Sequence, residues 1–229
     1  MEDYTKAIEI KPAYPEAHSN RGLTKFKLGD NAGALIDLNK AIQFNPNFAE
    51  AYLNRGSVIS ESGNSTKAIV DFDKAIELNP RNVDAYINRG NNKSILGDHK
   101  GAIEDCKKAI QLNPNKAEAY AKLANAKFRN GDNIGAIADF SRAIVLNPSD
   151  FNSYTNRGYV KAIMMDNEGA IMDFNKAIEI DPNYAEAYVR RGLSKGLLGD
   201  KLSGCQDLKK AADLGFYKAN EFIEKFCKD

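Results

Sequence analysis

The chain has 229 residues, of which 43% are hydrophobic and 28% are charged, a balance typical of folded proteins and not of disordered segments. Thirty-two basic residues stand against 31 acidic ones, and a net charge of +1 creates no overall field that would attract nucleic acid or an anionic membrane. No uncharged apolar run approaches the roughly 18 residues that a membrane-spanning helix needs. The composition therefore predicts no nucleic-acid partner and no membrane insertion.

Six of the seven prolines recur at a fixed step of 34 residues. They are Pro12, Pro46, Pro80, Pro114, Pro148 and Pro182. Glycines keep the same step, with one alanine among them, at Gly22, Gly56, Gly90, Ala124, Gly158 and Gly192. A period of 20–50 residues is the signature of a repeat protein, in which each unit stacks on its neighbours. The sequence therefore predicts a stack of 34-residue units.

Each unit is predicted to be a pair of antiparallel helices. In residues 49–82, apolar and small side chains recur at spacings of three and four in two runs that Gly63 separates. Gly63 can end the first helix in the left-handed conformation, and Pro80 ends the second because the residue before a proline is pushed out of the helical region. Gly56 and Ala68 would then face each other and let the two helices approach closely.

The repeated pattern resembles that of the tetratricopeptide repeat family. One unit of that family carries tyrosine, glycine, alanine and proline at positions that this chain fills with Tyr86, Gly90, Ala102, Ala109 and Pro114. The segments AEAYLNRG at 49–56 and DFDKAIELNP at 71–80 are typical of bacterial members, and RGLSKGLLGD at 191–200 is similar to cyanobacterial ones. The resemblance covers essentially the whole chain. It implies an all-α fold, a right-handed α-solenoid of antiparallel helix pairs that forms a superhelix.

The predicted organisation is an N-terminal half repeat, six full repeats and a C-terminal capping helix. Residues 1–14 match the second helix of a unit that lacks its first, so we expect further repeats upstream of Met1. Residues 217–229 carry Phe222, Ile223 and Phe226 on one helical face, as a cap over the last unit requires. The six full repeats are predicted at 15–48, 49–82, 83–116, 117–150, 151–184 and 185–218.

Two polar ladders depart from the family pattern. Arginine replaces the usual leucine before the glycine at Arg21, Arg55, Arg89, Arg157 and Arg191, and lysine replaces the usual tyrosine after it at Lys25, Lys93, Lys127, Lys161 and Lys195. Antiparallel packing would bring each arginine near an aspartate of the second helix, at Asp37, Asp71, Asp105, Asp139, Asp173 and Asp207. We expect repeated structural ion pairs and not a row of anion sites, because an unpaired arginine at a packed position would be costly. Leu123 opposite Asp139 is the exception, and the lysines are expected to keep their ammonium groups in water.

No catalytic constellation is visible in the sequence. The two histidines, His18 and His99, have no partners at the spacing of a metal site or of an activated nucleophile. Phosphate-binding loops, nucleophile elbows and paired-cysteine motifs are missing as well. The chain is therefore predicted to be no enzyme, to need no cofactor and to hold no metal.

The three cysteines are an odd number, which excludes a disulfide framework. Cys106 replaces the core phenylalanine of its unit and is expected to be a small buried side chain. A bridge between Cys205 and Cys227 is geometrically conceivable, but the favoured interpretation is three reduced thiols in a reducing compartment. This interpretation predicts a cytoplasmic protein.

The resemblance implies that first helices line a concave groove that holds a peptide of a partner protein. Helical phase places an asparagine in this groove in most units, and its amide can pair with both the N–H and the C=O of a peptide unit. The alternative is that these asparagines are surface residues or brace the neighbouring helix. Lys122, Arg129 and Arg190 favour an anionic ligand in the C-terminal half. The predicted groove residues are Asn20, Asn54, Asn88, Asn91, Lys122, Asn125, Arg129, Asn156, Tyr159 and Arg190.

The predicted function is that of a non-enzymatic protein–protein interaction scaffold or adaptor that binds an extended peptide or partner segment in its concave groove. Two alternatives stay open. The chain is a regulatory or targeting segment of a larger enzyme whose catalytic domain lies upstream, or it self-assembles into a homo-oligomer through the exposed N-terminal half repeat.

Overall fold

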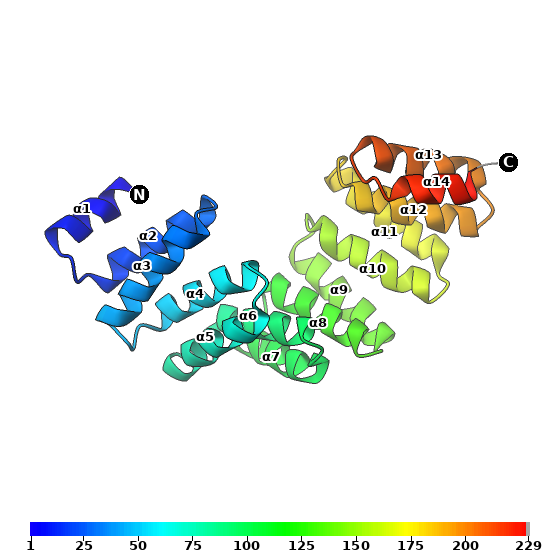
Figure 1. Ribbon diagram of the computed structural model, residues 1–229. Helices are drawn as coiled ribbons and strands as arrows, with labels where there is room; N and C mark the ends of the chain where they lie inside the picture. The colour runs from blue at the N-terminus through cyan, green and yellow to red at the C-terminus, as the bar shows by residue number, and fades with distance from the viewer. Residues whose placement is uncertain (228–229) are drawn as a thin grey trace. The chain divides into compact units, whose positions relative to one another are not determined.

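The computed structural model describes residues 1–227 of the chain (Figure 1). Within those residues it consists of fourteen α-helices joined by short turns, and no strand is present. The chain divides into two compact units, Met1–Pro114 and Asn115–Asp229. None of the described helices combines the length and the apolar character that crossing a membrane requires.

The first unit is a stack of helix pairs. Each even-numbered helix packs against the next odd-numbered one, α3 packs against α4, and α5 packs against α6. The lone helix α1 packs against α2. The helices are α1 (Glu2–Ile10), α2 (Pro15–Lys27), α3 (Asn31–Phe44), α4 (Ala49–Glu61), α5 (Ser65–Leu78), α6 (Val83–Ile95) and α7 (His99–Leu112).

The second unit repeats this arrangement with three helix pairs and a short final helix that packs against α13. The final helix covers most of the segment predicted as a cap, and residues 228–229 of that segment lie outside the described residues. The helices are α8 (Ala117–Arg129), α9 (Asn133–Leu146), α10 (Phe151–Ile163), α11 (Asn167–Ile180), α12 (Ala185–Leu197), α13 (Lys201–Asp213) and α14 (Ala219–Phe226). Both units confirm the predicted all-α solenoid of helix pairs.

The turn inside a pair has the predicted geometry. Gly63 adopts a φ of +84°, a left-handed conformation that glycine reaches without steric cost. Asn64 then caps α5, because its side-chain oxygen accepts a hydrogen bond of 3.1 Å from the backbone N–H of Lys67. In the turn between α10 and α11, Met165 takes the left-handed place with a φ of 65°.

Glycines of the first helices let the two helices of a pair approach closely. A Cβ atom on Gly56 would lie 2.7 Å from a ring carbon of Phe72, and one on Gly90 would lie 3.2 Å from the carbonyl oxygen of Ala102. Phe72 is fully buried, and Cys106 is buried at the equivalent place one repeat later. The glycine ladder therefore has the packing role that the sequence predicted.

The predicted ion pairs form in five helix pairs. In the pair α10–α11, Arg157 donates from Nε to Asp173 Oδ2 at 3.0 Å and from Nη2 to Asp173 Oδ1 at 2.6 Å. Such bidentate contacts are strong, and the aspartate side chains are only 1–8% exposed. The five pairs are Arg21–Asp37, Arg55–Asp71, Arg89–Asp105, Arg157–Asp173 and Arg191–Asp207.

The lysine ladder makes contacts that the sequence analysis did not predict. Each ammonium group lies 2.6–2.9 Å from a carboxylate oxygen of the aspartate in its own pair, while the lysine side chains stay 20–23% exposed. In the pair α8–α9, Leu123 replaces the arginine, and Asp139 keeps the contact with Lys127 at 2.6 Å. Sequence reasoning missed this second cation because it treated the lysine side chain as solvated.

Each arginine also reaches back to the preceding helix pair. Arg157 Nη1 donates to Ser141 Oγ of α9 at 2.9 Å, and Arg191 Nη1 donates to Asn175 Oδ1 of α11 at 2.7 Å. The guanidinium therefore ties its own aspartate to the second helix before it. This contact adds polar specificity to the apolar stacking of neighbouring pairs.

The prediction of three reduced thiols was wrong for two of the cysteines. Cys205 of α13 and Cys227, directly after α14, form a disulfide with their Cα atoms 5.8 Å apart. The turn at Gly215 brings the two helices side by side, so the cysteines meet although 22 positions separate them. Disulfides persist in oxidising compartments, so the state of the cysteines does not support the predicted cytoplasmic location.

Candidate functional site

A recess of about 330 Å³ in the second unit brings together half of the predicted groove residues. Its walls come from α8, α10 and α12, the first helices of three consecutive pairs. Predicted residues in the recess are Asn125, Arg129, Asn156, Tyr159 and Arg190, and Phe128, Phe140 and Val160 complete the lining.

The floor of the recess is apolar and firmly packed. Phe140 and Val160 are 1% exposed and belong to one core cluster, against which Phe128 packs. The ring of Phe128 meets the ring of Tyr159 edge to face, with the centroids 5.7 Å apart. This arrangement holds the aromatic part of Tyr159 in one orientation while the residue stays 37% exposed.

Arg190 is held in place from two sides. Its guanidinium carbon lies 3.9 Å from the centroid of the Tyr159 ring, a cation–π contact, and its Nε donates to Glu186 Oε1 at 3.0 Å. The carboxylate of Glu186 also accepts a hydrogen bond of 2.9 Å from the hydroxyl of Tyr184. The positive charge of Arg190 is therefore shared with an acidic neighbour, which weakens the case for a strongly anionic ligand.

The environment of Glu186 keeps it charged. Burial by itself would raise the pKa of the Glu186 carboxyl, but the hydrogen bonds from Arg190 and Tyr184 outweigh burial and hold this pKa below its ordinary value. Burial and the hydrogen bond to Glu186 raise the pKa of Tyr184, so this hydroxyl stays protonated and acts as a donor. The Glu186–Arg190 spacing of four residues was a signal for this pair that the sequence analysis did not use.

The asparagine ladder divides into two groups. In the first unit, Asn54 is buried and donates to Ser19 Oγ at 3.2 Å, and Asn88 donates to Ser57 Oγ at 3.4 Å. These two side chains brace neighbouring first helices, which was the alternative interpretation.

In the second unit, the Asn156 amide lies in the recess and has no hydrogen-bond partner among residues 1–227. Asn125 donates to the carbonyl oxygen of Ala121 at 3.0 Å and lines the same recess. The half-buried residues Asn20, Asn91 and Lys122 do not line it. The described residues also contain no cluster of histidine, cysteine, aspartate and glutamate side chains that would hold a metal ion.

Family models match most of the chain. Models described as tetratricopeptide repeats match residues 49–82, 83–116 and 106–138, and a model described as a TPR repeat matches 1–29, 22–63 and 166–199. The chain belongs to the tetratricopeptide repeat family. Proteins of this family typically mediate protein–protein interactions and are generally non-catalytic scaffolds.

Solved structures agree with this assignment. The crystal structure of MamA is 30% identical, covers 72% of this chain and 96% of its own, and has a TM-score of 0.63. A tetratricopeptide repeat protein from Parabacteroides merdae is 24% identical, with coverages of 99% and 91% and a TM-score of 0.76. YrrB, described as a TPR protein with an unusual peptide-binding site, is 23% identical, with coverages of 82% and 97% and a TM-score of 0.62. No protein with a curated description matches the sequence significantly.

Proposed function

We propose that this tetratricopeptide repeat protein is a non-enzymatic scaffold or adaptor that binds an extended segment of a partner protein in the recess of the second unit. The observation that carries the proposal is the convergence of three first helices on one recess with an apolar floor and polar walls. Membership of the family supports the class of function, and the description of YrrB as peptide-binding supports the kind of ligand.

The side chains of the recess suit a peptide backbone. The unpartnered Asn156 amide can donate to a peptide carbonyl and accept from a peptide N–H at once. Tyr159 and Arg190 present a flat, fixed wall beside it, and Phe128 offers an apolar contact for one side chain of the ligand. A volume of about 330 Å³ is at the small end of ligand sites, which favours one or two residues of an extended chain over a packed helix.

Several finer statements belong to the same proposal. The repeat boundaries at 34-residue steps from residue 15 to residue 218, and the capping role of α14, are part of it. A homo-oligomer through residues 1–14 and a role as the regulatory or targeting segment of a larger enzyme stay open as alternatives. A cytoplasmic location also stays a prediction, and the disulfide counts against it.

The test starts from a library of random twelve-residue peptides displayed on phage and selected on the full chain. Selected peptides should bind Asn156→Ala and Tyr159→Ala at least tenfold more weakly than the unchanged protein, because each substitution removes a contact inside the recess. Asn152→Ala is the matched control, since Asn152 is exposed on the same helix outside the recess and should leave the affinity unchanged. If the selected peptides bind both recess variants as tightly as the unchanged protein, the binding surface lies elsewhere and the proposal is overturned.

A further inference from the structure

Two arginines and no acidic residue of the described chain line the recess of the second unit. The guanidinium of Arg190 is already matched by the carboxylate of Glu186, to which its Nε donates at 3.0 Å. Arg129 is the last residue of α8 and is exposed, and its guanidinium makes no ion pair or hydrogen bond with any residue in the range 1–227. One uncompensated positive charge therefore remains at the recess.

The helices of the recess do not supply the missing negative charge. α8, α10 and α12 together contain only two acidic residues, Glu118 and Glu186. Glu118 lies 3.9 Å from Lys116, and Glu186 is held by Arg190. The charge of Arg129 is therefore left for a ligand of opposite charge.

The fold does not require an arginine at position 129. The equivalent positions of the other five pairs carry cationic, acidic and apolar residues, at Lys27, Glu61, Ile95, Ile163 and Leu197. A cation at the end of a helix interacts favourably with the helix dipole, but α6, α10 and α12 end on isoleucine or leucine without one. Since neither packing nor the dipole specifies this residue, its charge is available for recognition.

Other residues of the recess also differ from their equivalents. Tyr159 stands where the other pairs carry leucine, serine or asparagine, at Leu23, Ser57, Asn91, Asn125 and Leu193. Arg190 stands where four pairs carry asparagine, at Asn20, Asn54, Asn88 and Asn156. These departures meet, because Arg190 stacks on Tyr159 and the Tyr159 ring contacts Phe128, the residue directly before Arg129. The recess is where the repeat is specialised.

The walls of the recess define the side chains that fit it. Phe128 offers an apolar surface, and a carboxylate can accept two parallel hydrogen bonds from the guanidinium of Arg129. Successive side chains of an extended chain point to opposite sides, so two side chains on the same side are two positions apart. An apolar and an acidic side chain at this spacing would reach the recess together.

We propose that the recess selects a partner segment in which an aspartate or glutamate lies two positions from an apolar residue, with the side-chain carboxylate bound by Arg129. This inference rests on the proposed function, because it names the sequence that the recess accepts. Arg190, neutralised by Glu186, forms a wall beside the segment, and Arg129 determines the specificity.

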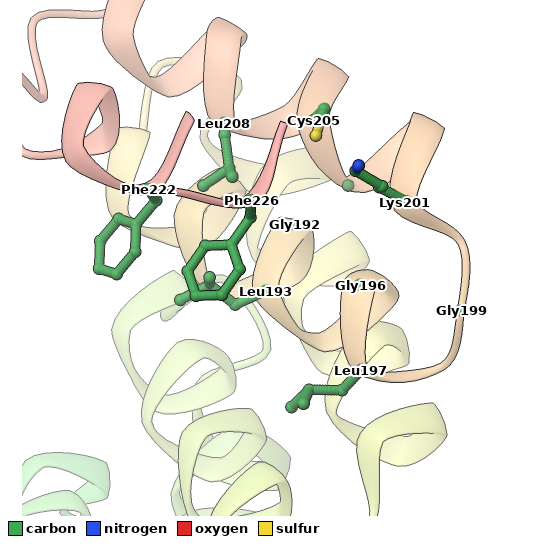
Figure 2. A pocket seen from close by; sticks show the side chains of 11 residues that line it. Gly192, Leu193, Gly196, Leu197, Gly199, Lys201, Cys205, Leu208, Phe222 and Phe226 are labelled. Carbon is green, nitrogen blue, oxygen red and sulfur yellow. The ribbon is translucent and has the colours of Figure 1, made fainter. Parts of the chain in front are cut away.

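The second unit also contains a larger pocket, and it does not match such a segment. The pocket has a volume of about 510 Å³, and Figure 2 shows it between α12, α13 and α14 with Phe222 and Phe226 at its edge. Its single charged lining residue, Lys201, already has an interaction partner in the chain. The pocket shares no lining residue with the recess, so substitutions can separate the two.

The experiment uses the displayed twelve-residue peptides, which are joined to the phage coat protein through their carboxyl ends and so offer side-chain carboxylates only. Selection on the full chain should enrich aspartate or glutamate two positions from an apolar residue. Synthetic amidated copies with asparagine or glutamine in place of the acidic residue should bind about tenfold more weakly, because they lose a charge-assisted contact. Arg129→Ala should weaken the acidic peptides by the same factor and leave the affinity of the amide copies unchanged.

Two variants serve as matched controls. Lys122 is another cation of α8 and lies seven positions from Arg129, which is about 10 Å along a helix. It does not line the recess, and charges interact over only about 8 Å at physiological salt, so Lys122→Ala should change the affinity by less than about twofold. Leu197 lines the larger pocket and is 72% exposed, so Leu197→Ala should leave the affinity unchanged.

The outcomes separate this inference from the proposed function. If Arg129→Ala and Arg129→Glu bind the acidic peptides as tightly as the unchanged protein, while Asn156→Ala and Tyr159→Ala bind them more weakly, the recess holds peptides without selecting a carboxylate. If none of these substitutions weakens binding, the proposed function fails as well. Selection without acidic residues, equal losses for Lys122→Ala and Arg129→Ala, or binding that needs a free terminal carboxylate would each overturn the assignment of a side-chain carboxylate to Arg129.

Discussion

The helix pairs α10–α11 and α12–α13 lie next to each other in the second unit and carry the same polar contacts. Asp173 in one pair and Asp207 in the other each accept two hydrogen bonds from an arginine, and each lies 2.8 Å from a lysine ammonium group. Both arginines also reach the second helix of the preceding pair. The polar framework is therefore repeated almost atom for atom.

The apolar contents of the two pairs differ. Phe174 fills the interior of α10–α11, whereas Leu208 at the equivalent place lines a pocket of about 510 Å³ between α12, α13 and α14. The second pair carries a disulfide to the segment after α14, which the first pair lacks. The comparison teaches that the polar ladder is kept from pair to pair, while the apolar filling differs and is accompanied by a covalent link in the last pair.

The largest expected effect tests the shared polar framework. Arg157→Leu and Arg191→Leu should each lower the free energy of unfolding by about 4 kcal/mol, because each removes two charge-assisted hydrogen bonds to a buried aspartate. Urea unfolding followed by circular dichroism measures the loss. Lys176→Leu is the control, since its pair with Glu179 is exposed and should contribute nothing measurable. A large difference in the free energy of unfolding between the two arginine variants would show that the two helix pairs are not equivalent.

The next effect should be confined to the last pair. Replacing Cys205 and Cys227 by alanine should lower the free energy of unfolding by about 3 kcal/mol, because the disulfide closes a loop of 22 positions in the unfolded chain. Hydrogen exchange should show lost protection in α13 and α14 and unchanged protection in α10 and α11. Reduction of the unchanged protein with a dithiol should reproduce this pattern. Equal loss of protection in both pairs would contradict a local covalent support.

The fold was predictable because the repeat imposes the same packing problem six times. A glycine such as Gly56 recurs wherever two helices approach closely, and a proline such as Pro80 recurs wherever a second helix ends, so the period alone reveals the helix pairs. The ion pairs were predictable for the same reason. The lysine contacts were not, since a long side chain on the surface of one helix gives no sign of which helix it will reach.

The candidate site was only partly predictable. Helical phase brought Asn156, Tyr159 and Arg190 to one recess, because residues three and four apart share a helix face. Helical phase could not show that Asn54 and Asn88 donate hydrogen bonds to serines on a neighbouring helix. The pocket between α12, α13 and α14 is formed by the packing of three helices, which no motif records.

Exchanging the core residues of the two pairs should have a smaller effect of opposite sign in each. Phe174→Leu should lower the free energy of unfolding by about 1.5 kcal/mol, because it leaves a cavity in a fully buried place. Leu208→Phe should raise it by about 1 kcal/mol, since it buries additional apolar surface in the pocket. Thermal denaturation of the two variants measures both. Destabilisation by Leu208→Phe would show that the last pair is fully packed and that the pocket cannot accept a ring.

The smallest expected effect is a pH dependence of stability that α12 has and α10 lacks. Glu186 and Arg190 form an ion pair on α12, whereas α10 carries the uncharged residues Asn152 and Asn156 at the equivalent positions. Because the pKa of Glu186 lies below its ordinary value in the folded protein, its contribution to stability is complete above the ordinary glutamate pKa of about 4.3 and is lost as the pH falls through the lower folded value.

Arg190→Gln removes the charged partner and should raise the pKa of Glu186, which carboxyl chemical shifts in an NMR titration report directly. The difference in melting temperature between the unchanged protein and Arg190→Gln should be positive at pH 7 and should shrink below pH 4. Other carboxylates, such as Asp37 with its pKa lowered to about 2, titrate equally in both proteins and cancel in this difference. A difference that does not change between pH 7 and pH 3 would mean that Arg190 stabilises α12 by its stacking on Tyr159 alone.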